Sequence, residues 1–494
     1  MTSDWEEKAV LFLEKKQYQD LLQFCEETIN VQEEGSLPYW YLGLVYLLTQ
    51  QGEEAQAIWL SGWFEAPGEE TSEERTETLV RILEQEAERQ FAKRAFSISA
   101  EIRENIQEIQ PENLNNTLFL IRDLIKNQTF SIEYLEQWEF WQRLQANKNQ
   151  TIEATLLGDI LVYILVQFPV ENKEELMNLS LQAVEDKSNF FKSVVVAVGK
   201  VAYKQSKYKA AIEILQIAEK VQPDFIPIFQ YLSQIQTDIG KHKQAIEAAE
   251  KLIQNSQTLL EKTDAAFFKL RALLSAGNWK YISSATQQYK EKLEEVCEHY
   301  SSQEISNSKY IDDDTVTLPL AAFYLSQVED NPRQNRLLQN KTIDIFQEIL
   351  LTNQTQRFSF LSRQLISNKR LRVGYIGATL RFHSVGWLSR WLIKNHTKED
   401  FHTTIYLINR RPDALTEGLI EKADDFKLLD KSTYESAEQI AKDEIDILVD
   451  LDSATLTETC RILSFKPAPI QVTWLGWDAS GLPAIDYYMA DPYV

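Results

Sequence analysis

The stretch "LRVGYIGATLRFHSVGW", from Leu371 to Trp387, decides how this chain is divided. Its apolar start, Leu371 to Ile376, predicts a short strand. A turn of small residues follows, and then a charged and aromatic loop that contains His383. The chain before this point is mostly helix-forming and rich in Gln, Glu and Lys. The stretch therefore marks a change from helical to strand–turn–helix architecture.

Short apolar runs alternate with amphipathic segments from Leu371 to the end of the chain. The predicted strands are "LRVGYIG", "HTTIYLI", "FKLLD", "IDILVDL" and "IQVTWLG". The predicted helices between them are "SVGWLSRWLIKN", "DALTEGLIEKA", "ESAEQIAKD" and "LTETCRILS". This alternation is typical of a mostly parallel sheet with helices on both faces. We therefore predict an α/β domain in residues 369–494.

Polar and aromatic residues follow several of these strands, and ligands of such sheets bind beyond the carboxyl ends of the strands. Arg381 and His383 follow the first strand, and Ser384 could cap the next helix and turn its N-terminus toward an anion. The text after this strand is not GxGxxG, so a dinucleotide site is weakly supported. The candidates after two later strands are Asp452, Ser453, Thr455, Trp477, Asp478 and Ser480.

Each of these candidates also has a purely structural interpretation. Asp452 and Ser453 are explained equally well as helix caps, because short polar side chains accept hydrogen bonds from the first N–H groups of a helix. Trp477 could be a core residue, and His383 a hydrogen-bonded loop histidine. The residues alone leave these alternatives open.

The first three hundred residues contain an internal sequence repeat. The segments "KQSKYKAAIEIL", from Lys204, and "DIGKHKQAIEAA", from Asp238, match with an offset of 34 residues. Looser copies are "LLSAGNWKYISSATQQY" and, near the start, "YWYLGLVYLLTQQGEEAQAIW". A repeat of this length resembles the tetratricopeptide repeat, a helix pair that buries its apolar face only by stacking on neighbouring pairs. We predict such repeats in 1–66 and 195–300, degenerate repeats in 67–194, and a right-handed helical solenoid overall.

Two further segments connect the solenoid to the α/β domain. Residues 301–320 are polar, carry Asp312, Asp313 and Asp314, and have little periodicity, so they predict a linker. A helix-forming sequence pattern resumes in residues 321–368, and we predict a helical connector there. The concave face of a solenoid suits extended chains, so protein or peptide partners are expected on the repeats.

Composition and charge exclude several classes of protein. The 494 residues carry a formal net charge of −23, which would repel a phosphate backbone, so nucleic acid is not an expected partner. Cys25, Cys297 and Cys460 are too sparse for a disulfide framework or a CxxC metal site. The start "MTSDWEEKAV" lacks the order of a signal peptide, and the most apolar stretch, Ala154 to Phe168, is interrupted by Asp159. These features predict a cytoplasmic protein without a membrane span.

Four ordered motifs carry a family resemblance. They are "LRVGYIG" with "FHSVGW", "IDILVDL" with Thr455, "KPAPIQVTWLGW", and "SGLPAIDYYMAD". Together they resemble the start of the catalytic region of O-linked N-acetylglucosamine transferases and SPINDLY-type relatives, which also carry tetratricopeptide repeats upstream. The resemblance covers about Arg370 to Val494. It implies a Rossmann-like domain that is the first half of a two-domain glycosyltransferase fold. Such enzymes move a sugar from a nucleotide donor, UDP-GlcNAc or GDP-fucose, to Ser or Thr of proteins. The resemblance implies no required metal or cofactor.

The resemblance also implies roles for individual residues. The family's active-site histidine after the first strand corresponds to His383, which we predict to be catalytic. We predict substrate contacts for Arg381 beside it, for Thr455 and Trp477, and for Gln471, which matches the family's Pro-Ala-Pro-x-Gln signature. His383 is expected on a loop at the carboxyl edge of the sheet, near Thr455 and Trp477.

Three departures from the family pattern bear on these roles. Lys466 stands where the signature has arginine, and lysine keeps the charge but loses the planar fork. Ser453-Ala454 replaces the usual Gly-His or Gly-Tyr, so only Thr455 of that motif is retained. Asp478-Ala479 replaces a Pro-Gly/Asn-Thr segment, which puts the local loop contacts in doubt.

The end of the sequence sets a further expectation. In the family a second Rossmann-like domain follows and supplies most nucleotide-sugar contacts, whereas this sequence stops at Val494. We therefore expect the chain to be incomplete for catalysis and, alone, to bind a nucleotide sugar weakly. The alternative is a non-catalytic tetratricopeptide scaffold that binds peptides. A further α/β segment beyond Val494 would favour the enzyme, and a stop codon there would favour the scaffold.

Overall fold

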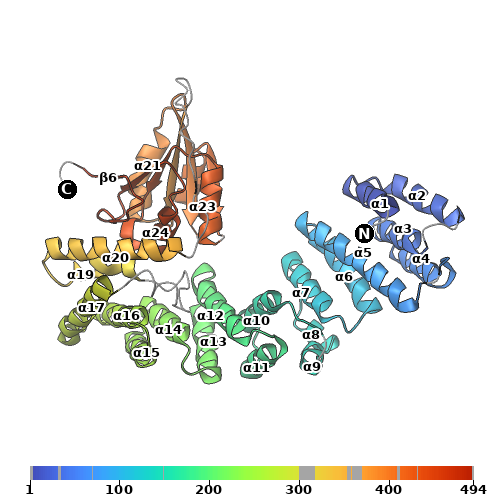
Figure 1. Ribbon diagram of the computed structural model, residues 1–494, viewed down its shortest axis with the longest axis horizontal. Coiled ribbons are helices and arrows are strands. Elements are labelled where there is room, and N and C mark those ends of the chain that lie inside the picture. Colours follow the sequence, from blue (N-terminus) through green and yellow to red (C-terminus); the bar gives the residue numbers. More distant parts are fainter. Residues whose placement is uncertain are drawn as a thin grey trace. The chain divides into compact units, whose positions relative to one another are not determined.

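The computed structural model describes residues 4–31, 35–68, 70–147, 150–299, 317–352, 358, 370–408, 412–430 and 432–491 (Figure 1). The chain folds into two compact units, residues 1–197 and 198–494. Among the described residues no strand precedes Leu371. No helix in these ranges has both the length and the apolar character needed to cross a lipid bilayer.

The first unit is made of helices that pack on their neighbours in the chain. Its helices are α1 (Asp4–Glu14), α2 (Tyr18–Val31), α3 (Leu37–Leu48), α4 (Gly52–Glu65), α5 (Ser72–Ala92), α6 (Phe96–Ile109), α7 (Leu114–Asn127), α8 (Glu133–Gln137), α9 (Phe140–Ala146), α10 (Ala154–Gln167) and α11 (Lys173–Ala183). A Cβ on Gly43 of α3 would lie 2.3 Å from Nε1 of Trp59 on α4. Such small residues let the paired helices cross closely.

The second unit begins with the helical repeats that contain the matching 34-residue segments. After α12 (Lys187–Lys204) come α13 (Tyr208–Val221), α14 (Ile226–Asp238), α15 (His242–Asn255), α16 (Leu259–Ser275) and α17 (Trp279–His299). Helices α13 and α15 begin at Tyr208 and His242, 34 residues apart, and the turn before α15 uses Gly240 at a φ of +76°, which glycine adopts without strain. The predicted tetratricopeptide-type helical fold is confirmed. Its right-handed sense and its predicted internal boundaries stay predictions.

The connection to the α/β domain is described from Thr317 onward. Residues 301–316, most of the predicted linker, lie outside the described residues, as does most of 353–369. The described part contains η1 (Leu318–Leu320), α19 (Ala321–Leu325) and α20 (Pro332–Thr352), which packs on α17. Helix α20 starts with proline, whose missing N–H costs nothing in the first turn of a helix.

Six parallel strands form the sheet. They are β1 (Leu371–Gly377), β2 (Phe401–Ile408), β3 (Asp425–Leu429), β4 (Ile447–Asp450), β5 (Ile470–Trp474) and β6 (Tyr487–Met489), in the order β3-β2-β1-β4-β5-β6. This is the doubly wound order of Rossmann-like folds. The predicted α/β class is therefore confirmed, and β6 is an addition to it.

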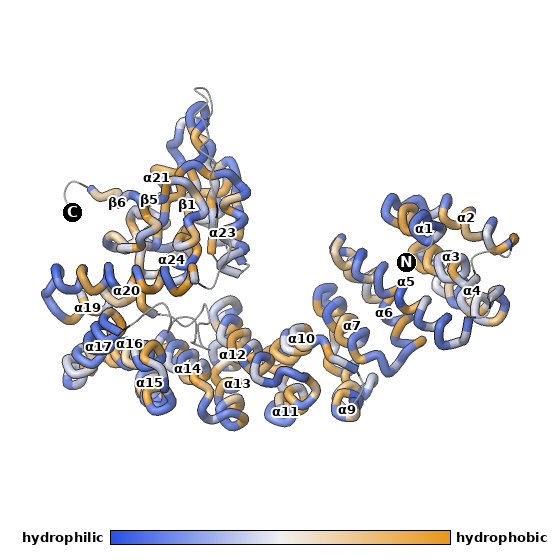
Figure 2. Tube along the Cα trace, viewed as in Figure 1, coloured by the Kyte–Doolittle hydropathy of each residue, from blue (hydrophilic) through white to orange (hydrophobic). Residues whose placement is uncertain are grey.

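Four helices connect these strands. They are α21 (Ser384–Lys394), α22 (Ala414–Ile420), α23 (Thr433–Lys442) and α24 (Thr457–Ser464), preceded by η2 (Ser453–Thr455). The chain steps one way from β1 to β3 and back from β3 to β5, so right-handed crossovers place α21 and α22 on one face and α23 and α24 on the other. Accordingly, α21 packs on α22, α23 on α24, and α20 also on α24. Figure 2 shows hydrophobic residues along β1, within a core that includes Val373, Ile405 and Val449.

Candidate functional site

The sheet reverses its winding between β1 and β4, which are neighbours in the sheet although they lie far apart in the chain. The chain leaves β1 toward α21 on one face and leaves β4 toward α24 on the other. We call residues 378–383 the β1 loop and residues 451–456 the β4 loop. Ligands of open α/β sheets bind where two such loops part. The β1 and β4 loops are therefore the candidate site.

Asp452 ties the two loops together. Its carboxylate accepts hydrogen bonds from Ala378 N at 2.8 Å and Thr379 Oγ1 at 2.5 Å in the β1 loop, and from Thr459 Oγ1 at 3.0 Å in α24. Burial raises the pKa of Asp452, while these hydrogen bonds and the charge of His383 act to lower it. The carboxylate thus holds the start of the β1 loop against the β4 loop.

A second buried carboxyl group, Asp450, lies at the end of β4. It accepts hydrogen bonds from the backbone N of Asp452 at 3.0 Å and of Ser453 at 3.1 Å, and from Thr473 Oγ1 at 3.0 Å. Burial, together with the neighbouring Asp452, raises the pKa of Asp450 to about 7, against the effect of these bonds. Asp450 therefore fixes the shape of the β4 loop from inside the sheet.

The loop after β5 packs directly on the β4 loop. A Cβ on Gly476 would lie 2.4 Å from the carbonyl carbon of Asp452, and Ser453 Oγ donates to the carbonyl oxygen of Asp478. Ser453 has a φ of 55° and Leu475 a φ of 69°, left-handed values that cost energy in residues with a side chain. Strained backbone of this kind clusters at functional sites, which supports a site at this edge.

His383 lies at the end of the β1 loop, where it is exposed and caps α21. Its Nδ1 accepts a hydrogen bond from Val385 N at 3.3 Å. Ser384, the expected cap, is instead the first helical residue. The cap falls one position earlier because His383 has an extended backbone, with φ −152° and ψ 156°, and its ring nitrogen reaches the N–H two residues on.

Arg381 lies two residues before His383 and is half-buried. Its backbone packs on the first turn of α21, because a Cβ on Gly386 would lie 2.2 Å from the Arg381 carbonyl oxygen. Its Nε is buried and has no hydrogen-bond partner among the described residues. A guanidinium in this place can donate to an oxygen of a bound molecule.

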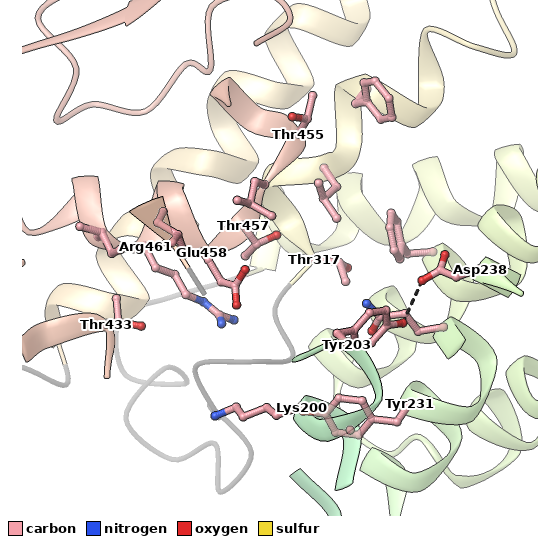
Figure 3. A pocket seen from close by; sticks show the side chains of 18 of the residues that line it. Lys200, Tyr203, Tyr231, Asp238, Thr317, Thr433, Thr455, Thr457, Glu458 and Arg461 are labelled. Atoms are coloured by element: carbon pink, nitrogen blue, oxygen red, sulfur yellow. Dashed lines mark hydrogen bonds between the residues drawn. The ribbon is translucent and has the colours of Figure 1, made fainter. Parts of the chain in front are cut away.

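Thr455 ends η2, where its Oγ1 donates to the Asp452 carbonyl oxygen at 2.6 Å. It also lines a cavity of about 570 Å³ within the second unit (Figure 3). Figure 3 shows Thr457 and Arg461 of α24 on the side of the α/β domain and Tyr203 of the repeats on the other. His383 is not among the described residues that line this cavity.

The repeat wall of the cavity mixes aromatic and polar side chains, and three of the polar ones are bonded to one another. Asp238 of α14 accepts a hydrogen bond from the Tyr203 hydroxyl at 2.8 Å and pairs with Arg271 of α16 at 2.6 Å. Burial raises the pKa of Tyr203, and Asp238 raises it further. The tyrosine therefore stays a hydrogen-bond donor at neutral pH.

The structure places the last two predicted site residues differently from each other. Trp477 is half-buried and meets Phe323 of α19 edge-on, with ring centroids 5.6 Å apart. Gln471 has no exposed surface, and its amide nitrogen donates to the carbonyl oxygens of Leu463 at 3.0 Å and Ala484 at 2.9 Å. A fully enclosed side chain cannot touch a substrate. Gln471 therefore has a structural role here, in place of the expected substrate contact.

Of the two carboxyl groups that hold the loops, Asp450 was not singled out by the sequence patterns. Asp452 and Ser453 were candidates with helix caps as the alternative interpretation, and Asp452 makes no cap hydrogen bond but spans the two loops. The signal that could have found Asp450 is the alternation of acidic residues in "VDLDS" at the end of a buried strand. Asp452 lies two residues beyond Asp450, the last residue of β4, and its charge raises the pKa of Asp450, so the two carboxyl groups act on each other. Among the described residues no cluster of three or more potential ligands could hold a metal ion.

Replacing Asp452 with asparagine is expected to loosen the β1 loop. The amide can no longer accept at both former oxygen positions, so Ala378 N–H or the Thr379 or Thr459 hydroxyl loses its partner, at a cost of about 1–3 kcal/mol. Hydrogen exchange of residues 378–383 should rise in Asp452→Asn. It should stay unchanged in the control Asp425→Asn, an exposed carboxylate whose partner is His402. Unchanged exchange in Asp452→Asn would show that the loops do not depend on this carboxylate.

Comparison with known proteins finds relatives of this region. Residues 333–494 match the family model of glycosyl transferase family 41. A protein of Oryza sativa subsp. japonica, named a probable UDP-N-acetylglucosamine–peptide N-acetylglucosaminyltransferase SPINDLY, is 29% identical over 132 residues, which are 26% of this chain and 14% of that protein. The similarly named SEC protein of Arabidopsis thaliana is 30% identical over 131 residues, 26% of this chain and 13% of that protein.

One solved structure is also similar over a larger part of the chain. It is an O-GlcNAc transferase variant from Thermobaculum terrenum, 20% identical, covering 63% of this chain and 55% of that one, with a TM-score of 0.45. The match to the rice protein spans about one seventh of that protein's length. The resemblance to O-GlcNAc transferases and SPINDLY proteins is therefore confirmed for residues 333–494, the part of the chain that matches glycosyl transferase family 41.

Proposed function

We propose that this protein is a protein O-glycosyltransferase, which moves a sugar from a nucleotide sugar to Ser or Thr hydroxyls of other proteins. The observation that carries the proposal is the family 41 match over residues 333–494, which includes the tied β1 and β4 loops. Relatives at 28–30% identity are named as UDP-N-acetylglucosamine–peptide N-acetylglucosaminyltransferases. UDP-GlcNAc is therefore the first donor to test, and GDP-fucose the second.

The reaction sets requirements that the two loops can help to meet. The acceptor oxygen forms a bond to the anomeric carbon, the bond from that carbon to the diphosphate oxygen breaks, and the hydroxyl proton passes to water or to the released diphosphate. Catalysis then depends on orienting the two reactants and on stabilising the charge that develops on the diphosphate. We propose that Arg381 and His383 from the β1 loop, Thr455 from the β4 side and Trp477 after β5 contact the reactants. Asp452 holds the β1 loop against the β4 loop, and Gln471 supports the end of α24 and the segment before β6 through Leu463 and Ala484.

We also propose that the repeats hold the protein acceptor. Stacked helix pairs offer a continuous surface for an extended peptide. The cavity beside Thr455 joins α12, α14 and α16 to the carboxyl edge of the sheet, so a peptide on these helices has a path toward the loops. A cytoplasmic location fits the three free cysteines.

Label transfer tests the proposal. The purified protein is incubated with protein acceptors and with UDP-GlcNAc or GDP-fucose that carries a label in the sugar, and the label is located by mass spectrometry. Where the donor-binding half that the resemblance implies is present, we expect label on Ser or Thr, and His383→Ala should lower the rate by about 100-fold or more, as for other groups at a reacting centre. His299→Ala, in the exposed last turn of α17, is the control and should leave the rate unchanged. Peptide binding without any transfer would favour the non-catalytic scaffold.

A further inference from the structure

The imidazole of His383 is held by the helix that it caps. Its Nδ1 accepts the Val385 N–H at 3.3 Å. A ring nitrogen that accepts a hydrogen bond uses its lone pair and carries no proton. In the neutral ring the single proton then lies on the other nitrogen, Nε2. The cap therefore determines which tautomer His383 adopts.

The loop before this ring is fixed at both ends. Asp452 holds its start through Ala378 and Thr379, and the carboxylate of Asp413, the cap of α22, accepts Phe382 N at 2.7 Å. Close packing of Gly386 against the Arg381 carbonyl leaves no space for the loop to slide along α21. With the loop and the helix both fixed, the ring keeps Nδ1 toward the helix and Nε2 on the opposite side.

A doubly protonated ring conflicts with this arrangement. A second proton on Nδ1 would face the Val385 N–H, and a positive ring would lie at the positive end of the α21 dipole. The buried carboxylate of Asp452 attracts a positive ring, but its two oxygens already accept three hydrogen bonds. The neutral ring with its proton on Nε2 is the form that accepts the Val385 N–H.

We infer that His383 acts in the proposed transfer as a hydrogen-bond donor through Nε2–H, and not as the base that takes the acceptor's hydroxyl proton. A base would need a lone pair on the exposed nitrogen, and Nε2 has none while Nδ1 caps α21. An N–H donor suits an oxygen that gains negative charge, which in this reaction is the oxygen of the leaving diphosphate. The catalytic part of this inference rests on the proposed function; the assignment of the tautomer does not.

Nitrogen NMR tests the tautomer without any substrate. The protein has five histidines, so ¹⁵N-histidine labelling gives few ring signals, and His383→Gln identifies the pair that belongs to His383. At neutral pH we expect the Nδ1 shift of an unprotonated nitrogen and the Nε2 shift of a protonated one. A protonated Nδ1 would overturn the inference. Because this measurement needs no activity, it stands even if the protein transfers no sugar.

Two variants separate the donor role from the base role. His383→Gln can offer an N–H near the position of Nε2, whereas His383→Asn can replace the cap through its oxygen but does not reach that position. If His383 is a donor, His383→Gln should transfer sugar at a rate within about tenfold of the wild type. His383→Asn should fold well, but its transfer rate should be about 100-fold lower, like that of His383→Ala. A Gln variant as inactive as Ala, with its fold intact by circular dichroism, would contradict the donor role.

Discussion

Replacing Gly476 with alanine is expected to destabilise the α/β domain by about 3 kcal/mol or more. The added Cβ would lie 2.4 Å from the carbonyl carbon of Asp452, 2.6 Å from its oxygen and 2.7 Å from the nitrogen of Ser453. All three are backbone atoms, so no side-chain rotation relieves the clash. The Gly476 N–H also donates to the Leu451 carbonyl oxygen at 3.0 Å, so it holds the loop after β5 to the β4 loop. The β4 loop would have to move, and the contacts of Asp452 with the β1 loop would be lost.

Hydrogen exchange followed peptide by peptide is the suitable measurement, because two compact units need not unfold together. A loss of about 3 kcal/mol corresponds to exchange about 100-fold faster in the β1 and β4 loops. Gly418→Ala is the matched control: its Cβ would meet only Nζ of Lys394, at 3.9 Å, and alanine improves helix propensity within α22. If Gly476→Ala kept full protection, the loops could not be packed as described.

Replacing Asp264 with asparagine is expected to reduce the pH dependence of stability. Asp264 lies in α16, and its Oδ1 accepts hydrogen bonds from Thr317 N at 3.1 Å and Thr317 Oγ1 at 2.5 Å, which tie the repeats to the start of η1. Burial raises the pKa of Asp264 to about 7, although the bonds from Thr317 lower it. The other groups that face this carboxyl are Gln230, Glu261, Tyr289 and Arg461.

The direction of the effect follows from these values. The folded pKa of about 7 lies above the ordinary value of 3.8, so the folded state binds the proton more tightly than the unfolded state. This stabilisation is complete below about pH 4, is lost as the pH rises through about 7, and amounts to about 4 kcal/mol. Asparagine is neutral throughout and keeps an oxygen for Thr317. Asp450 titrates in the same range, so part of the slope remains in the variant.

Urea unfolding between about pH 4 and pH 7 measures this slope. The wild type should lose stability as the pH rises, and Asp264→Asn should lose less and match or exceed the wild type near pH 7. The control is Asp224→Asn, an exposed carboxylate before α14, which should follow the wild type. Equal slopes for Asp264→Asn and the wild type would mean that Asp264 is charged across this whole range.

The sheet could be predicted from sequence as far as its strands are buried. The runs that end in Ile408 and Asp450 are apolar because both faces of a central parallel strand are covered. Strand β6 could not be found this way, because Tyr487, Tyr488 and Met489 are all exposed and show no alternation. A short edge strand is determined by its neighbour and leaves little signal of its own.

The sequence was enough to predict that the site lies at the carboxyl edge of the sheet, but not which residues contact one another there. The strand–loop order was enough to select His383 and Thr455. The contact of Asp452 with Ala378, 74 residues earlier, depends on the pairing of β1 with β4, and no local periodicity encodes that register. The buried position of Gln471 follows from the same pairing of distant segments. Motif similarity therefore identified the residue but not its surroundings.

One face of α20 contacts the loop after β5 residue by residue. Arg336 donates to the Ala479 carbonyl oxygen at 2.5 Å, Gln339 to that of Ser480 at 3.3 Å, and Gln347 accepts Ala484 N at 3.0 Å. These anchors extend over about 16 Å of helix, which makes α20 a rigid strut between the last repeat and the carboxyl edge. Bending of the repeats under the load of a bound protein would therefore travel along this strut and displace the loops, without deforming the sheet.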